Sequence, residues 1–173
     1  MKIKAIDVKK LREETNAGMM DCKKALLESE GDFDKAKLLL REKGQSKADK
    51  KSGRTTAQGL VKVQNNNDHI CILEVNCETD FAAKDSLFDD FVTKISSLVL
   101  EDSIDTIEQL NQQAIDEFAS VEDFRKYVVS KIGENITVRR FERIPVNGIA
   151  GTYIHGSKIA SVAIVDSGDE QLA

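Results

Sequence analysis

The sequence has no tryptophan, a single proline and few aromatic residues, and it contains no long apolar run. A helix needs about 20 consecutive apolar residues to cross a bilayer, and none of the apolar runs approaches that length. The amino-terminal residues Met1–Lys4 also lead into no apolar signal-peptide region. We therefore expect a cytoplasmic protein that has no membrane partner.

Cysteine and histidine are also scarce. The three cysteines, Cys22, Cys71 and Cys77, form an odd and sparse set that is typical of reduced thiols, and we predict no disulfide. They lack the paired short spacing of a zinc site, so small buried hydrophobes are favoured over metal ligands. Of the two histidines, His155 lies near a predicted turn, where its position alone favours a structural role.

Motifs for catalysis and nucleotide binding are absent as well. No phosphate-binding loop is present, because the glycine pair at 53–59 lacks the required lysine. Neither a G-x-S-x-G nucleophile elbow nor an H-E-x-x-H metal helix occurs. The pair Glu78 and Asp80 has a spacing that is common in helix-capping turns. We predict no enzyme, no cofactor and no direct nucleotide binding.

Charge is distributed unevenly along the chain. Residues 1–56 hold 15 Lys and Arg against 10 Asp and Glu, whereas residues 57–173 hold 10 against 20. Such a split indicates two modules. A basic run in residues 45–56 could be an RNA-binding arm, but it lacks the interleaved aromatics of single-strand binders. A charged linker is therefore favoured, and no specific nucleic acid is expected.

Three short helical patterns fill residues 1–44. Asp7 is predicted to cap the first, and the third is predicted to end at Gly44. The apolar positions at helical spacing are Val8 and Leu11, then Met19, Cys22, Ala25 and Leu26, then Phe33, Ala36, Leu39 and Leu40. These patterns predict a small three-helix module whose limited core is near the size at which independent folding becomes marginal.

Residues 57–173 combine strand and helix patterns. Apolar runs on both sides of Asn65–Asp68 predict a β-hairpin. Helical spacing follows from Asp85 onward, continues through Ile107, Leu110, Ala114 and Phe118, and ends at Gly133. Further strands are predicted from Ile136, over 149–155 and over 159–165. This order predicts an α+β core with a largely antiparallel sheet and helices on one face.

The stretch Glu74–Phe81 ends the second strand of that hairpin. Phe81 follows Asp80 and precedes two alanines, so it has few local neighbours that could bury it. It could face a partner or it could be a core aromatic at a strand-to-helix turn. Because large apolar residues are usually buried, the pattern alone favours the core.

Four segments together are similar to the elongation factor Ts family. Residues 11–26 (LREETNAGMMDCKKAL) resemble its amino-terminal signature, and residues 74–84 (EVNCETDFAAK) resemble its second signature around T-D-F-V. Residues 131–135 and 155–156 match further segments. The resemblance implies a guanine-nucleotide exchange factor for elongation factor Tu, with a ubiquitin-associated-like module at 1–44, a linker at 45–56 and a dimerisation-type core at 57–173.

The resemblance also implies site residues. The loop that would displace magnesium from the partner consists of Thr79, Asp80, Phe81 and Ala82. Docking by the first module is assigned to Leu11, Met19, Met20 and Lys23, although the apolar ones among them could instead pack the bundle. Other contact positions are Ile132, Gly133 and His155.

Two features depart from the family pattern. Ala82 stands where valine is usual, which leaves less apolar surface. Family members with this organisation continue into a second core half, whereas this chain stops at 169–173 where a helix is expected to begin. The sequence is therefore expected to be shortened, and the alternative function is a binding module without full exchange activity.

Overall fold

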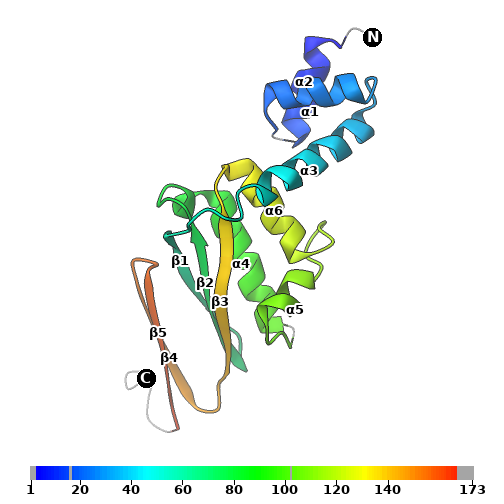
Figure 1. Cartoon of the computed structure of the whole chain (residues 1–173). Helices are drawn as coiled ribbons and strands as arrows, with labels where there is room; N and C mark the ends of the chain where they lie inside the picture. Colours follow the sequence, from blue (N-terminus) through cyan, green and yellow to red (C-terminus); the bar gives the residue numbers. More distant parts are fainter. Residues whose placement is uncertain (1–2, 16, 102, 167–173) are drawn as a thin grey trace.

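The computed structural model describes residues 3–15, 17–101 and 103–166. Three helices precede a region of antiparallel strands and further helices (Figure 1). The predicted α+β class is therefore confirmed. The expected helix start at 169–173 lies outside the described residues.

The amino-terminal helices are α1 (Ala5–Thr15), α2 (Met19–Glu28) and α3 (Phe33–Asp49). Asp32 caps α3, because its side chain accepts a hydrogen bond of 3.0 Å from the Lys35 amide. The residues buried between the helices are Val8, Leu11, Cys22, Ala25, Leu26 and Ala36. This small core confirms the three predicted helical patterns, but the expected cap at Asp7 was wrong, because α1 begins at Ala5 and Asp7 lies in its first turn.

The predicted end of the third helix at Gly44 was wrong, because α3 continues to Asp49. A Cβ added to Gly44 would lie 3.2 Å from the Cβ of Ser130, so the glycine permits close approach of α3 to a later helix. The same approach brings the side chains of Gln45 and Asp123 within 2.9 Å. The helix thus enters the predicted linker, and the proposed module boundaries stay a prediction.

A three-stranded antiparallel sheet has the order β1 (Gln58–Asn65), β2 (His69–Cys77), β3 (Ile136–Pro145). The first two strands form the predicted hairpin. Helices α4 (Ser86–Glu101) and α6 (Val121–Ile132) lie on one side of this sheet (Figure 1). Their largest fully buried side chains include Phe88, Phe91 and Phe124, which form the centre of the core.

The helical pattern predicted through Phe118 was wrong in its second half. Helix α5 covers only Ile107–Gln112, and Ile115 then bridges to Phe118 around a turn in which Asp116 has a φ of 49°. Phe118 is nevertheless buried and stacks on Phe124 at a centroid distance of 4.8 Å. Phe118 is therefore apolar because it packs in the core from a turn, and its spacing does not reflect a helix.

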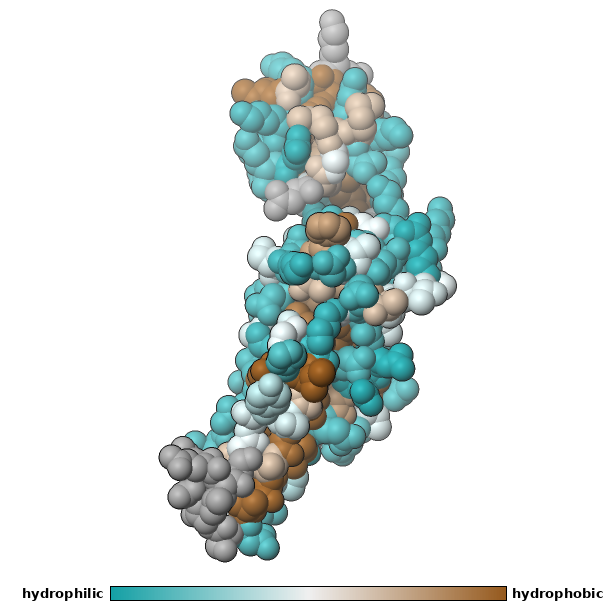
Figure 2. All heavy atoms as spheres, turned by 90° about the vertical axis from the view of Figure 1, so that its left-hand side faces the viewer, coloured by the Kyte–Doolittle hydropathy of each residue, from teal (hydrophilic) through white to brown (hydrophobic). Residues whose placement is uncertain are grey.

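The last two strands, β4 (Ile149–His155) and β5 (Ile159–Val165), have the predicted bounds but pair only with each other. Their hairpin contacts β1 through a hydrogen bond of 2.8 Å from the Val61 amide to the Ser157 carbonyl. Apolar side chains are exposed along the face that carries this hairpin (Figure 2). No helix in the described part of the chain is both long and apolar enough to span a membrane.

Candidate functional site

The loop after β2 exposes Phe81. The chain leaves the sheet at Cys77, passes Phe81 in helical backbone geometry (φ −67°, ψ −47°) and enters a short 3-10 helix, η1 (Ala82–Lys84). This path leaves Phe81 80% exposed, whereas its neighbour Ala82 is buried. The pattern-based expectation of a core aromatic was wrong, because the aromatic ring points away from the core that receives Ala82.

Hydrogen bonds from a second segment hold this loop. The amide and hydroxyl of Thr79 donate to the carboxylate of Glu134 at 2.9 and 2.7 Å. The amide of Asn135 donates to Glu78 at 2.6 Å. The Asn135 side chain in turn donates to the carbonyl of Arg54 at 2.9 Å. The loop is therefore joined to the α6–β3 connection and to the segment before β1.

The charged and ionisable groups of the loop have distinct environments. Asp80 is exposed, and its hydrogen bond from Lys84 at 3.0 Å holds the pKa of that carboxyl below its usual value. Burial raises the pKa of the Cys77 thiol to about 11. This thiol donates to the Thr79 carbonyl at 3.1 Å. At neutral pH the loop therefore presents a carboxylate and an aromatic ring, while its thiol stays protonated inside.

Gly133 and His155 reach the same end of the sheet as this loop. Gly133 ends α6 with a φ of 87°, directly before the Glu134 that binds Thr79. His155 is exposed beside the β4–β5 turn, where Lys158 donates to the Gln58 side chain at 2.9 Å. Because Gln58 pairs with Cys77, the β4–β5 turn beside His155 lies at the end of the sheet where the loop begins. Ile132, also predicted, is only partly exposed at the end of α6.

The predicted docking residues of the first module divide into two groups. On α2, Met19 and Met20 are 43% and 62% exposed, and Lys23 is exposed as well. Leu11 has no exposed surface and packs in the three-helix core. We correct its assignment, because a side chain that is wholly buried between helices is not available to a partner.

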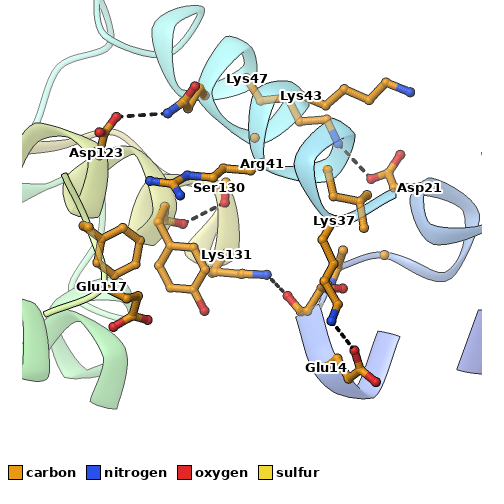
Figure 3. Close-up of a pocket in the computed structure, with 18 residues that line it drawn as sticks. Glu14, Asp21, Lys37, Arg41, Lys43, Lys47, Glu117, Asp123, Ser130 and Lys131 are labelled. Atoms are coloured by element: carbon orange, nitrogen blue, oxygen red, sulfur yellow. Dashed lines mark hydrogen bonds and ion pairs between the residues drawn. The ribbon is translucent and has the colours of Figure 1, made fainter. Parts of the chain in front are cut away.

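A cavity of about 520 Å³ lies between the first module and α6 (Figure 3). Its wall combines apolar and charged side chains, and Lys37 and Lys47 form ion pairs with Glu14 and Asp21 at 2.6 and 2.8 Å. Lys131 donates to the Thr15 carbonyl, and burial lowers the pKa of its ammonium group. Within the residues that the structure describes, no group of three or more His, Cys, Asp or Glu side chains could hold a metal ion.

Residues 78–173 match the family described as Elongation factor TS. The chain belongs to this family. The matched range begins within the loop that carries Phe81 and includes Gly133, Glu134 and His155.

Elongation factor Ts proteins are also similar to the chain as a whole. The protein from Ruthia magnifica subsp. Calyptogena magnifica is 46% identical over 176 residues, which cover 100% of this chain and 60% of that protein. The Thioalkalivibrio sulfidiphilus protein is 45% identical with the same coverage. The Legionella pneumophila (strain Lens) protein is 42% identical over 99% of this chain and 59% of its own length. The chain thus spans about 60% of the length of these relatives.

Residue patterns alone missed the role of Glu134 and Asn135. Both lie in the segment that resembles the elongation factor Ts family, but the pattern offered only Gly133 as the end of a helix. A glycine at that position was the available signal, since it allows the chain to reverse and bring the next two residues to a neighbouring loop. Which loop they reach depends on the tertiary structure.

Proposed function

We propose that the chain binds elongation factor Tu in the cytoplasm and promotes release of its GDP, so that GTP can be reloaded. It would act on GDP-bound Tu and remain bound to the nucleotide-free form. The observation that carries this proposal is the 80% exposure of Phe81. Phe81 lies within the range that matches the family, in a loop that is held by the hydrogen bond from Thr79 to Glu134. A nucleotide exchange factor makes and breaks no covalent bond, so the chain would not be an enzyme.

In the proposed mechanism the ring of Phe81 enters the partner beside its magnesium site, with Thr79 and Asp80 forming the rest of the contact. Ala82, the fourth residue predicted for this loop, is buried and would support the loop from within the chain. Displacement of the metal leaves the repulsion between nucleotide phosphates less neutralised, and the nucleotide dissociates faster. Linkage makes the effect reciprocal: the free energy by which the chain weakens nucleotide binding is the free energy by which the nucleotide weakens binding of the chain.

A second contact would come from the first module. Met19 and Met20 are exposed on α2 with Lys23, and unbranched methionine side chains adapt well to a partner surface. Gly133, Ile132 and His155 would contribute the contacts around the Phe81 loop. The module would contribute mainly to the affinity for Tu, and the loop would accelerate release of the nucleotide.

The size of one side chain limits what Phe81 can contribute. Burial of a phenylalanine is worth roughly 1.5–3 kcal/mol, or about one to two powers of ten in an equilibrium constant. A larger acceleration of release requires the surrounding contacts to act with it. Ala82 is already buried within the chain, so it adds little new surface.

The test is release of a fluorescent GDP from elongation factor Tu over a range of chain concentrations. We expect Phe81→Ala to lower the maximal release rate by about ten- to a hundredfold, because the lost contact forms in the complex from which the nucleotide leaves. Met20→Ala should instead raise the concentration that gives half-maximal release. Leu38→Ala removes an exposed apolar side chain elsewhere in the module and should change neither quantity. An unchanged maximal rate with Phe81→Ala would sink this proposal.

The second candidate is a Tu-binding module without exchange activity. It is favoured by one observation, since the chain spans only about 60% of the length of its relatives. Calorimetric titration of Tu with the chain distinguishes the two. Binding without faster GDP release would identify the second candidate, whereas undetectable binding would contradict both.

A further inference from the structure

We infer that Glu134 is a positioning residue that holds the Thr79–Phe81 loop in the conformation that exposes Phe81. The inference rests on the proposed function for what the exposed ring does, but the positioning itself is a property of the free chain. Glu134 would not touch the partner's nucleotide site. It would act through Thr79.

Burial does not hold Phe81 in place. A core aromatic is fixed by the surface it buries, but Phe81 is 80% exposed and keeps little of that stabilisation. An exposed ring on a loop would ordinarily sample several directions, because loops move on nanosecond to microsecond timescales. The direction in which its side chain leaves the chain is therefore set by the backbone on either side of it.

Thr79 fixes the backbone on both sides of that ring. Its amide and its hydroxyl both donate to the Glu134 carboxylate, at 2.9 and 2.7 Å. Its Oγ1 also accepts a hydrogen bond of 3.3 Å from the amide of Ala82. Asp80 and Phe81 thus lie between Thr79 and Ala82, which are joined by the hydrogen bond from the Ala82 amide to the Thr79 hydroxyl. Hydrogen bonds to a carboxylate are shorter and stronger than those between neutral groups, so Glu134 is the strongest anchor of this turn.

The neighbouring residues Glu78 and Asn135 form a similar hydrogen bond, in which the carboxylate belongs to the loop and the amide to the segment after α6. The amide of Asn135 donates to the Glu78 carboxylate at 2.6 Å. Asn135 is only 2% exposed, and its side-chain amide donates to the Ser52 and Arg54 carbonyls at 3.2 and 2.9 Å. Two consecutive residues of the loop are therefore bound by two consecutive residues after α6, and the second of these, Asn135, is also bound to the segment after α3.

Gly133 brings Glu134 to this position. Its φ of 87° is in the left-handed region, which residues with a side chain rarely adopt. This conformation directs the chain from the end of α6 toward the loop. Glu134 then follows as the first residue after the turn. The position of the Glu134 carboxylate thus depends on the backbone conformation of Gly133, the residue directly before it.

The first experiment measures the loop in the free chain. The sequence contains no tryptophan, so Phe81→Trp introduces a single indole at the position of interest. We expect its fluorescence anisotropy decay to show little fast local motion in the otherwise unchanged chain. Glu134→Ala should increase the fast component clearly, and Glu134→Gln, which keeps one acceptor oxygen, should increase it less. Glu142→Ala removes an exposed carboxylate from β3 and should leave it unchanged.

The second experiment asks whether Glu134 acts through Phe81. Glu134→Ala should lower the maximal rate of GDP release from Tu by about tenfold, the size expected for losing a hydrogen bond to a charged acceptor. In a chain that already carries Phe81→Ala, the same change should have almost no further effect. Thr79→Ser keeps both donors to Glu134 and should lower the release rate less than Thr79→Val, which keeps only the amide donor. A general loss of folding would instead reduce release in both backgrounds.

The outcomes separate the two proposals. Unchanged anisotropy decay in Glu134→Ala overturns the positioning role, and so does a tenfold loss of release that persists in the Phe81→Ala background. If the unmodified chain does not accelerate GDP release, the proposed function fails, and the anisotropy measurement alone decides the role of Glu134. Circular dichroism of each variant shows whether the fold is retained.

Discussion

The molecule exposes apolar side chains in two regions that are supported in different ways. Met20 lies on a helix of a bundle whose buried residues include Cys22, Ala25 and Ala36, all small side chains. Phe81 lies on a loop joined by hydrogen bonds to a core that buries three phenylalanines completely. The first region presents unbranched methionine side chains on a small bundle, and the second presents an aromatic ring on a hydrogen-bonded loop beside a large core.

This difference explains why the first region also contacts the second. Three-helix bundles of this size bury little apolar surface and are marginal by themselves. Helix α3 extends that bundle against α6, where Lys126 and Asp49 approach to 2.9 Å and Gln45 binds Asp123 at the same distance. Exposed ion pairs contribute little, so the close packing of α3 on α6 at Gly44 is the more important contact. The larger core thus supports the smaller one.

The largest expected effect is loss of the larger core by Phe124→Ala. Phe124 is almost fully buried and packs edge-on against Phe91 at a centroid distance of 5.1 Å. Its truncation should lower the free energy of unfolding by about 3–5 kcal/mol. Denaturant titration followed by circular dichroism measures this loss. Phe81→Ala is the matched control, because the same substitution at an exposed ring should change stability by less than about 0.5 kcal/mol.

If the larger core supports the smaller one, Phe124→Ala should destabilise both regions. Amide hydrogen exchange resolved by peptide shows this directly, since protection should fall in α1 and α2 as well as in the sheet. Full protection of α1 and α2 in this variant would break the comparison, because the small bundle would then be stable without its neighbour.

The next effect is expected from Leu11→Ala in the smaller core. Leu11 is wholly buried, and its truncation should cost about 2–5 kcal/mol of local stability. Hydrogen exchange should accelerate in α1, α2 and the first half of α3, while the sheet keeps its protection. Leu38→Ala, an exposed position on α3, serves as the control and should have little effect. Equal loss of protection throughout the chain would mean that the two regions unfold as one unit.

Sequence patterns predicted the regular elements better than the surfaces. Periodicity identified the hairpin, the bounds of β4 and β5, and the end of α6, because each follows from the local alternation of apolar residues and from turn-forming residues. It failed where a residue type has two uses. The pattern predicts a helix end at Gly44, whereas the glycine allows close packing against Ser130. The pattern also predicts a helix through Phe118, whereas this residue fills a buried turn.

The candidate site shows the same limit. Phe81 is a large apolar residue of the kind usually buried in a core, and only the three-dimensional structure reveals that its ring is exposed. Family resemblance indicated Phe81 correctly as a surface position but also indicated Leu11, which is buried. Glu134 could not be found from patterns, since its partner Thr79 lies 55 residues earlier in the chain and no local rule relates the two.

The smallest expected effect is a pH dependence that belongs to the larger core. Burial raises the pKa of the Cys71 thiol from 9.0 to about 12, so above pH 9 the unfolded chain releases a proton that the folded chain keeps. The unfolded state then binds fewer protons, and stability must fall as pH rises from about 9 toward 12. We expect on the order of 1 kcal/mol of loss between pH 9 and pH 10 from this thiol. Denaturant midpoints measured at both values, in the unmodified chain and in Cys71→Ala, isolate its contribution from that of lysine and tyrosine. An equal pH dependence in the two chains would show that the thiol already ionises in the fold, and the larger core would then be less closed than its buried phenylalanines indicate.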